Sequence, residues 1–215
     1  CQITIPNYVT MLSPTDNCTA SGSIVEAQSI TAGAYNVSGD NSTVVVNYTA
    51  TDGATVPNTT TCTVTITVND DDAPTFTCPT PTLILNTTGN NGCEVIIPNL
   101  VAMVSDAADN CGLAAVPVTQ SIAAGTYSGA SDSNTIPVTV TVTDAASPVN
   151  TTTCSYTFTV NDDDAPTFTC PTPTLVLNTT GNNGCEVIIP NLVAMVSNAA
   201  DNCGLAAVPV TQSIA

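Results

Sequence analysis

An internal repeat of 92 residues constrains this chain more than any other feature of its sequence. Residues 69–123 and 161–215 differ at only two positions. The cysteines follow the same spacing, since five of them recur 92 residues later: Cys1, Cys62, Cys78, Cys93 and Cys111. Self-similarity at a fixed period is the signature of a repeat architecture, so we expect a tandem array of one structural unit.

The repeat divides the sequence into one complete unit and two partial ones. Residues 73–164 form the complete unit. Residues 1–72 form a more diverged unit without its first strand, and residues 165–215 correspond to the first half only. Because the partial units are not self-contained, we expect either further repeats in a longer polypeptide or neighbouring chains that complete them.

The charge composition excludes several classes of function. The 215 residues include 17 Asp and Glu but no Lys, Arg or His, which gives a formal net charge of −17. Nucleic acids and anionic membrane surfaces bind through basic residues, so neither is an expected partner. Metal sites and general bases that need imidazole are also excluded. No apolar run approaches the roughly 18 residues of a membrane span, so this segment should not insert into a membrane.

Alternation of apolar residues with threonine predicts an all-β fold. Residues 62–68, 136–142 and 154–160 each alternate in this way, as half-buried strands do. Two more strands, 82–86 and 93–97, flank an expected hairpin turn at Asn91 and Gly92. Roughly seven strands in each unit predict tandem immunoglobulin-like β-sandwiches, and the short linkers between units predict end-to-end stacking into a rod.

The cysteines predict disulfides and an extracellular or cell-surface location. Each unit contains four cysteines without histidine or a Cys-x-x-Cys pair, which disfavours zinc. The strand directions favour Cys78 with Cys154 and Cys93 with Cys111, and at equivalent positions Cys1 with Cys18 and Cys185 with Cys203. In the alternative, neighbouring units are joined through Cys93 with Cys170 while Cys111 pairs with Cys154.

Two acidic triplets near the unit junctions are the candidate metal ligands. Adjacent carboxylates repel one another unless a cation lies among them, and hard oxygen ligands suit calcium. We expect the first triplet to meet the loop that holds Asp106, Asp109 and Asn110, together with Asp144. The candidate ligands are Asp70, Asp71, Asp72, Asp109, Asp144, Asp162, Asp163 and Asp164. The alternative is a solvated acidic linker, and no other cofactor is required.

Glycosylation and catalysis are the remaining chemistries to consider. Eight asparagines begin Asn-x-Ser/Thr sequences: Asn17, Asn36, Asn41, Asn47, Asn58, Asn86, Asn150 and Asn178. The alternative is that threonine simply serves as the outward-facing residue of strands. The glutamates Glu26, Glu94 and Glu186 are isolated, and duplication would multiply any active site along the array. We therefore expect no enzyme.

Several motifs resemble the hyalin repeat, or HYR module. They are Asp-Asp-Ala-Pro-Thr-Phe-Thr-Cys-Pro at 71–79, Asp-Asn-Cys at 109–111, Asp144, and Thr-Cys-Ser-Tyr-Thr-Phe-Thr-Val at 153–160. The resemblance implies an immunoglobulin-like extracellular module for adhesion and scaffolding, including long bacterial surface fibres, without enzymatic activity. Some relatives contain only the cysteines that match Cys78 and Cys154, which supports that pairing.

The sequence as a whole predicts a mechanical role outside the cell. We expect a structural component of an extracellular filament or surface fibre that self-associates or continues into further repeats. The absence of Lys and Arg also removes every trypsin cleavage site. The alternative is a cell-surface adhesin or carbohydrate-binding stalk that uses loops such as 124–134, where Tyr127 is the only aromatic residue.

Overall fold

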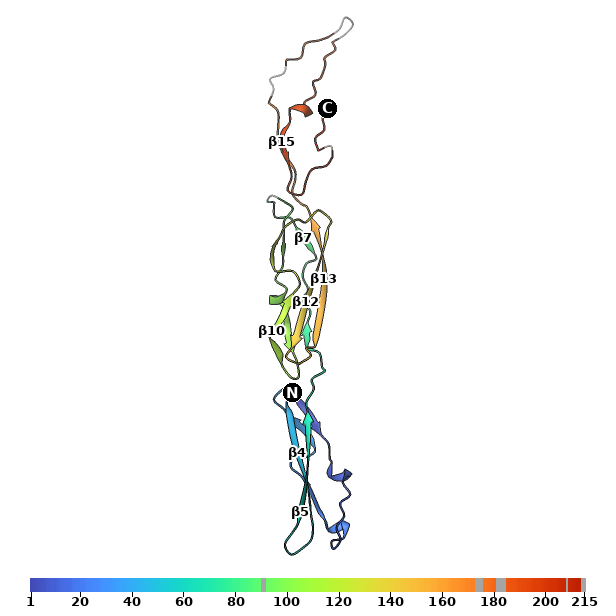
Figure 1. Ribbon diagram of the computed structural model, residues 1–215. Helices are drawn as coiled ribbons and strands as arrows, with labels where there is room; N and C mark the ends of the chain where they lie inside the picture. The colour runs from blue at the N-terminus through green and yellow to red at the C-terminus, as the bar shows by residue number, and fades with distance from the viewer. Residues whose placement is uncertain (90–91, 173–175, 181–184, 208, 214–215) are drawn as a thin grey trace. The chain divides into compact units, whose positions relative to one another are not determined.

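The computed structural model describes residues 1–89, 92–172, 176–180, 185–207 and 209–213. Within these ranges every helix or strand element is either a β-strand or a single turn of 3-10 helix, which confirms the expected all-β fold (Figure 1). No helix in the described ranges has the length and apolarity needed to cross a membrane. Asn91, part of the expected hairpin turn, lies outside the described residues.

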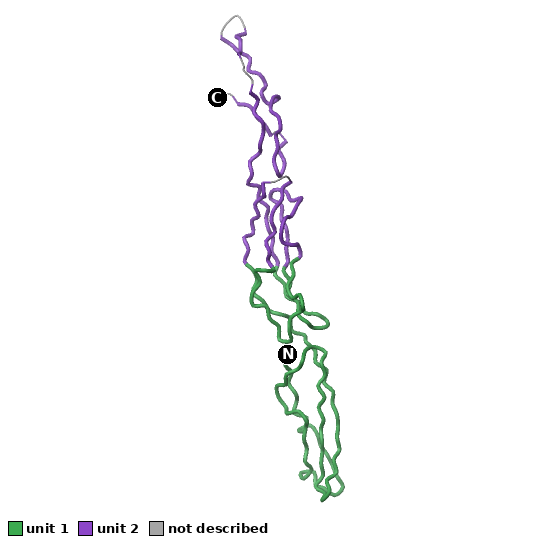
Figure 2. Tube along the Cα trace, turned by 90° about the vertical axis from the view of Figure 1, so that its left-hand side faces the viewer, with its two compact units in different colours: residues 1–79, 101–120, 140–154 green, residues 80–100, 121–139, 155–215 purple. Residues whose placement is uncertain are grey.

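The chain divides into two compact units, shown in green and purple in Figure 2. Unit 1 comprises Cys1–Pro79, Val101–Gln120 and Val140–Cys154, and unit 2 comprises Thr80–Leu100, Ser121–Thr139 and Ser155–Ala215. The complete 92-residue repeat therefore contributes segments to both units. The boundaries of this repeat at residues 73 and 164 stay predictions, and so does the expected end-to-end stacking of the units into a rod.

Unit 1 consists of short antiparallel sheets. Its elements are β1 (Gln2–Ile5), η1 (Val9–Met11), η2 (Ser21–Ser23), β2 (Val25–Gln28), β3 (Gly33–Asn36), β4 (Thr43–Thr51), β5 (Thr59–Thr67), β6 (Thr75–Thr77), η3 (Val101–Met103), β9 (Ser105–Ala108) and β10 (Leu113–Gln120). Strand β1 pairs with β3 and β6 with β9. Strands β2, β4 and β5 form a sheet in that order, with β5 at one edge.

Unit 2 contains β7 (Ile84–Asn86), β8 (Val95–Ile97), β11 (Gly125–Tyr127), β14 (Thr167–Thr169), η4 (Val193–Met195) and β15 (Ser197–Ala200). The long strands β12 (Thr135–Asp144) and β13 (Thr151–Asn161) contribute residues to both units. They belong to a sheet of order β10-β12-β13-β7, in which β7 is parallel to β13.

The hairpin expected between residues 82–86 and 93–97 is not the main pairing of these strands. Strand β8 instead pairs with β11, and β7 pairs with β13. Among the described residues, an antiparallel bridge between Thr87 and Val95 and a hydrogen bond from the Thr88 N–H to the Glu94 carbonyl join the two segments. The two strands and their antiparallel contact were therefore predicted, whereas the longer pairings join residues far apart in the chain, which no local pattern encodes.

Strict alternation determines which side chains form the cores. Along β4, Val44, Val46 and Tyr48 are buried, while threonine and asparagine face outward. Tyr48 packs edge-on against Tyr8, with ring centroids 5.2 Å apart. In β12 the even-numbered residues from Ile136 to Val142 are buried in the same way.

The same alternation brings two carboxylates into the interior. Asp144 is the last residue of β12 and continues its buried even-numbered side, so its side chain is fully buried. Asp70 lies two residues after the buried Val68 and continues the inward side of β5. Both acidic residues therefore lie where the strand pattern would otherwise place an apolar side chain.

Candidate metal centre

Three carboxylates converge in unit 1. Asp70, Asp109 and Asp144 each place one oxygen atom within 4.8 Å of the other two. Asp144 is fully buried and Asp70 is 6% exposed. As the sequence indicated, a residue of the first triplet meets Asp109 and Asp144. Two of these side chains end inward-facing strand patterns, and the third lies in the turn after β9.

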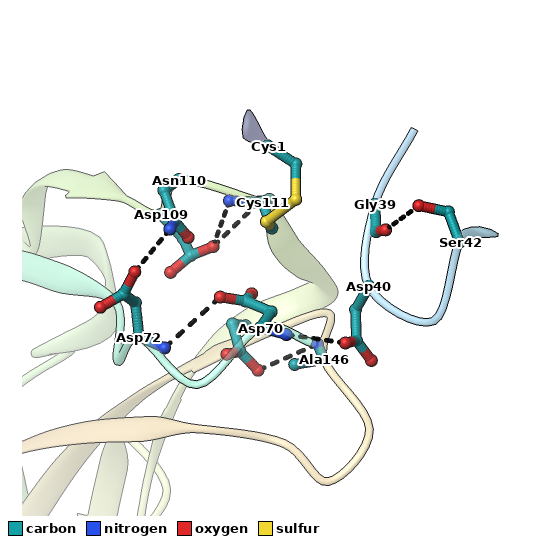
Figure 3. Close-up of a disulfide and its surroundings, with 12 residues drawn as sticks. Cys1, Gly39, Asp40, Ser42, Asp70, Asp72, Asp109, Asn110, Cys111 and Ala146 are labelled. Atoms are coloured by element: carbon teal, nitrogen blue, oxygen red, sulfur yellow. Dashed lines mark hydrogen bonds between the residues drawn. A yellow bond between two sulfur atoms is a disulfide. The ribbon is translucent and has the colours of Figure 1, made fainter. Parts of the chain in front are cut away.

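Backbone hydrogen bonds hold two of the three carboxylates. Asp144 Oδ1 accepts hydrogen bonds from the N–H groups of Ala146 (3.1 Å) and Asn150 (2.9 Å), and its Oδ2 accepts one from Asn150 Nδ2 (2.8 Å). Asp109 Oδ1 accepts from the N–H groups of Cys111 (2.7 Å) and Gly112 (3.0 Å), as Figure 3 shows for Cys111. The φ angle of Gly112 is 109°, a conformation that favours glycine, so this turn depends on the residue type.

Two carboxylate oxygens at the centre have no hydrogen-bond partner. They are Asp70 Oδ2 and Asp109 Oδ2, and both atoms are buried. An unpaired buried polar group costs roughly 1–3 kcal/mol, and more when it is charged. The chain contains no Lys, Arg or His that could neutralise the carboxylates. Each pair of charges also repels by roughly 3 kcal/mol or more at an effective dielectric constant of 20.

The electrostatics favour a bound cation. Burial raises the pKa of the Asp70 carboxyl, and the charge of Asp109 raises it further. A divalent cation between the three carboxylates would supply the missing partner of both unpaired oxygens and remove the repulsion. Calcium fits these ligands because it prefers carboxylate oxygens and fills its remaining coordination positions with carbonyl oxygens or water.

Asp40 supports the centre, although no sequence motif singled it out. Its Oδ1 accepts a hydrogen bond from the Asp70 N–H (2.8 Å), drawn in Figure 3, and its Oδ2 accepts one from the Ser147 N–H (2.9 Å). These two bonds lower the pKa of Asp40. The residue recurs 92 positions later as Asp132, which accepts from the Asp162 N–H (3.0 Å), so alignment of the repeats would have found it.

The other candidate ligands lie outside this group. Asp71 is exposed, and Asp72 Oδ2 accepts a hydrogen bond from Asn110 Nδ2 (2.7 Å). Asp106 accepts hydrogen bonds from the hydroxyls of Thr77 and Ser105. Neutral donors therefore already satisfy Asp72 and Asp106.

The second triplet forms a hydrogen-bond network in unit 2. Thr87 Oγ1 donates to Asp162 and Asp164, Asn86 Nδ2 donates to Asp163, and Asn202 Nδ2 donates to Asp164. In the part of the chain that the structure describes, Asp162, Asp163 and Asp164 belong to no cluster of three acidic ligands. Metal binding by this triplet stays a prediction.

Disulfides join cysteines that lie far apart in the sequence. Cys1 pairs with Cys111 across 110 residues, and Cys93 pairs with Cys203 across the same separation. Cys78 pairs with Cys154, as preferred from the sequence. Cys1–Cys111, drawn in Figure 3, directly follows the Asp109 turn. This bridge and the metal centre therefore lie at the same place in unit 1.

The other preferred pairs were wrong. Cys93 is not bonded to Cys111. Instead, Cys111 binds Cys1, the equivalent of Cys93 in the preceding repeat, and Cys93 binds Cys203, the equivalent of Cys111 in the following repeat, each pair within one compact unit. Cys1–Cys18 and Cys185–Cys203 are not formed, and neither are the alternative pairs Cys93–Cys170 and Cys111–Cys154. In the described ranges, the exposed cysteines without a disulfide are Cys18, Cys62, Cys170 and Cys185. The preferred pairing placed every bridge within one repeat, and the alternative joined repeats through other cysteines, whereas the structure joins repeats through Cys1–Cys111 and Cys93–Cys203.

The eight candidate glycosylation sites divide into two groups of four. Nδ2, the atom that a glycan would occupy, donates a hydrogen bond in Asn41, Asn58, Asn86 and Asn150. Asn17, Asn36, Asn47 and Asn178 are exposed.

In the loop 124–134, Tyr127 is part of β11, Ser128 bonds to Glu94, and Ala130 is buried. Most other residues of the loop, including 131–134, are exposed.

Comparisons with known proteins show only a distant likeness. No family model matches the sequence, and no curated protein matches it significantly. Among solved structures, the extracellular cadherin domains 3–6 of protocadherin gamma B2 match with 19% identity and a TM-score of 0.28, over 60% of this chain and 36% of theirs. Domains 3–6 of protocadherin gamma B7 in a cis-dimer structure (24%) and the protocadherin gamma B4 extracellular domain (22%) match with the same TM-score, over 36% and 24% of their chains. The chain thus spans about a third or less of these proteins.

Proposed function

We propose that this chain is a load-bearing structural component of an extracellular filament or surface fibre. The disulfides between repeats are the observation behind the proposal, because they change which part of the chain bears a pulling force. Disulfides persist in oxidising surroundings, which supports a location outside the cytosol. The hyalin-repeat motifs and the absence of trypsin sites support the same assignment.

The disulfides provide a short covalent path along the molecule. A force applied at Cys1 passes through its bridge to Cys111, back along the chain to Cys93, and through the second bridge to Cys203. Only the segment from Cys93 to Cys111 then bears the load, and it spans at most about 65 Å when fully extended. The rest of the chain between residues 1 and 203 is bypassed. In a longer array, each repeat would add one such step.

A metal ion at the candidate centre would stabilise the backbone next to the Cys1–Cys111 bridge. Its ligands come from the end of the first repeat, from the turn before Cys111 and from the end of β12. A bound calcium ion would therefore fix the backbone around the bridge that transmits the force. This tie is reversible, whereas the disulfide is permanent under oxidising conditions.

Single-molecule force spectroscopy tests the proposed function. The intact protein, pulled between terminal tags, should let residues 1 and 203 separate by no more than about 73 Å, because the Cα–Cα spans of 4.0 and 4.3 Å across the two bridges add to the extended 93–111 segment, whereas the fully reduced protein should reach roughly 700 Å. The Cys18→Ser variant is the matched control and should behave as the wild type, because Cys18 forms no disulfide. An oxidised molecule that extends as far as the reduced one would exclude a load-bearing role for the bridges.

A further inference from the structure

The two cysteines of the first bridge between repeats lie far apart in the chain. Cys1 pairs with Cys111 across 110 residues. Cys93 is much nearer to Cys111, 18 positions away in the sequence. Because the entropic cost of closing a flexible loop rises with its length, the unfolded chain should bring Cys93 to Cys111 roughly 15 times more often than Cys1. The native pairing therefore depends on contacts that bring Cys1 to Cys111 before their sulfur atoms react.

On the Cys1 side, hydrogen bonds connect the cysteine to Asp70. The Val37 N–H donates to the Cys1 carbonyl (3.1 Å), which continues the pairing of β1 with β3. The turn that follows holds Asp40, whose Oδ1 accepts a hydrogen bond from the Asp70 N–H (2.8 Å). All of these contacts lie within residues 1–72. The first repeat by itself therefore holds Cys1 near the Asp70 carboxylate.

On the Cys111 side, the cysteine is connected to Asp109. Asp109 Oδ1 accepts hydrogen bonds from the N–H groups of Cys111 (2.7 Å) and Gly112 (3.0 Å). Figure 3 shows the bridge beside this turn. The turn fixes the backbone of Cys111 relative to the Asp109 carboxylate, so an interaction that positions this carboxylate also positions the cysteine.

The Asp70 and Asp109 carboxylates meet between these two sides. Each places one oxygen within 4.8 Å of the other and of Asp144. Asp70 is 6% exposed, and in the described residues neither its Oδ2 nor Asp109 Oδ2 has a hydrogen-bond partner. Without a cation, the two repeats repel each other where they have to meet. A divalent cation shared by these oxygens reverses the sign of that interaction.

The same local arrangement recurs around the second bridge between repeats. Asp201 Oδ1 accepts a hydrogen bond from the Cys203 N–H (2.9 Å), and Cys203 is bonded to Cys93. Asp132 accepts one from the Asp162 N–H (3.0 Å), as Asp40 does from Asp70. An aspartate that fixes the bridging cysteine is therefore a property of the repeat.

We propose that a divalent cation bound at the three-carboxylate centre directs Cys111 to Cys1 during oxidative folding and keeps it from pairing with Cys93. The inference goes beyond the load-bearing function, because it concerns how a bridge forms and not what the bridge bears. It also assigns the centre a role before the covalent step: the carboxylates of the two repeats are joined first, and the two sulfur atoms then lie close enough to react.

The covalent step is thiol–disulfide exchange with a disulfide oxidant, for which oxidised glutathione is the probe. The first cysteine thiolate attacks the oxidant and displaces one glutathione thiolate. The second cysteine thiolate attacks the resulting mixed disulfide and displaces the other. One S–S bond breaks and one forms, the two cysteines lose two electrons, and their two protons appear on two molecules of reduced glutathione.

Oxidative refolding of the reduced full chain, followed by alkylation and peptide mapping, tests the proposal. Urea-unfolded protein is diluted into a glutathione redox buffer with either calcium chloride or EDTA. The ratio of Cys1–Cys111 to Cys93–Cys111 should be at least about ten times higher in calcium, because the cation offsets the loop-closure preference. Cys78–Cys154 is the internal control and should form equally in both buffers, since neither cysteine belongs to the centre.

Two variants and one salt control separate cation binding from general charge effects. Asp70→Asn should lose the calcium effect. Asp71→Asn is the matched control, because it removes the same charge from an exposed neighbour and should keep the effect. Sodium chloride at equal ionic strength should not replace calcium, because screening supplies no partner for the two unpaired oxygens.

Three results would overturn the proposal: equal ratios in calcium and EDTA, equal calcium effects in the two variants, or an effect that sodium chloride reproduces. Each of them would leave the load-bearing function standing, because force spectroscopy tests bridges that have already formed. Conversely, long extension of a molecule with both bridges intact would contradict that function and leave the role of the cation in folding unaffected.

Discussion

At the residue scale, the important feature is the position of two carboxylates in strand patterns that otherwise bury apolar side chains. Asp70 and Asp144 occupy inward positions, and the Asp109 turn places a third carboxylate beside them. A hydrophobic residue at either position would fill the same space at lower electrostatic cost. Acidic residues there are therefore consistent with a centre that gains its stability from a bound cation.

Replacing Asp70 tests this centre directly. Asp70→Asn removes an unpaired buried oxygen and a charge, so we expect calcium affinity to fall at least tenfold in isothermal titration calorimetry. Asp71→Asn is the matched control, because it removes the neighbouring exposed carboxylate and should leave affinity unchanged. In the wild type, calcium at 100 times its Kd should stabilise the fold by about 2.7 kcal/mol. Equal affinities of the two variants would contradict the assignment.

Asp40 gives a prediction of pH dependence. Hydrogen bonds from Asp70 and Ser147 lower its pKa in the folded state below the ordinary value of 3.8. Its contribution to stability is therefore fully present above pH 4 and is lost as the pH falls through the lowered folded-state pKa. Asp40→Asn should be less stable than the wild type at pH 6, with the difference shrinking below pH 4, as measured by urea denaturation in EDTA. A difference that stays constant down to pH 2 would refute this role.

At the element scale, the strands were largely predictable and their connections were not. The alternation in residues 136–142 and 154–160 identified β12 and β13 because each strand's pattern is local. The parallel pairing of β7 with β13 joins residues about 75 positions apart, and no local pattern encodes it. The pairs Cys1–Cys111 and Cys93–Cys203 were missed for the same reason, since no local pattern relates cysteines 110 positions apart.

The bridge between repeats should dominate the stability of unit 1. Cys111→Ser removes a disulfide that closes a long loop, so the free energy of unfolding should fall by about 2–4 kcal/mol. Cys18→Ser, which removes an exposed cysteine without a disulfide, should leave it within about 0.5 kcal/mol. Chemical denaturation without reductant, followed by circular dichroism, measures both. Equal losses in the two variants would show that the bridge contributes no specific stability.

At the scale of the whole molecule, the metal centre and the disulfide beside it should act together. Chelation alone should lower the midpoint of thermal unfolding in the oxidised protein. After Cys111→Ser, chelation should lower it by a larger amount, because the remaining ties around Asp109 are then non-covalent. Differential scanning calorimetry of the two proteins with and without EDTA measures this coupling. Identical shifts would mean that the two features stabilise the protein independently.

The three disulfide loops overlap, and this overlap protects the chain against the consequences of proteolytic cleavage of its backbone. The loops run from Cys1 to Cys111, from Cys78 to Cys154 and from Cys93 to Cys203, so every peptide bond between residues 1 and 203 is enclosed by at least one of them. A protease that hydrolyses any single bond in this span leaves both fragments covalently attached. A fibre built in this way would survive scattered cleavage without breaking, and its length would be lost only when reduction accompanied the cut.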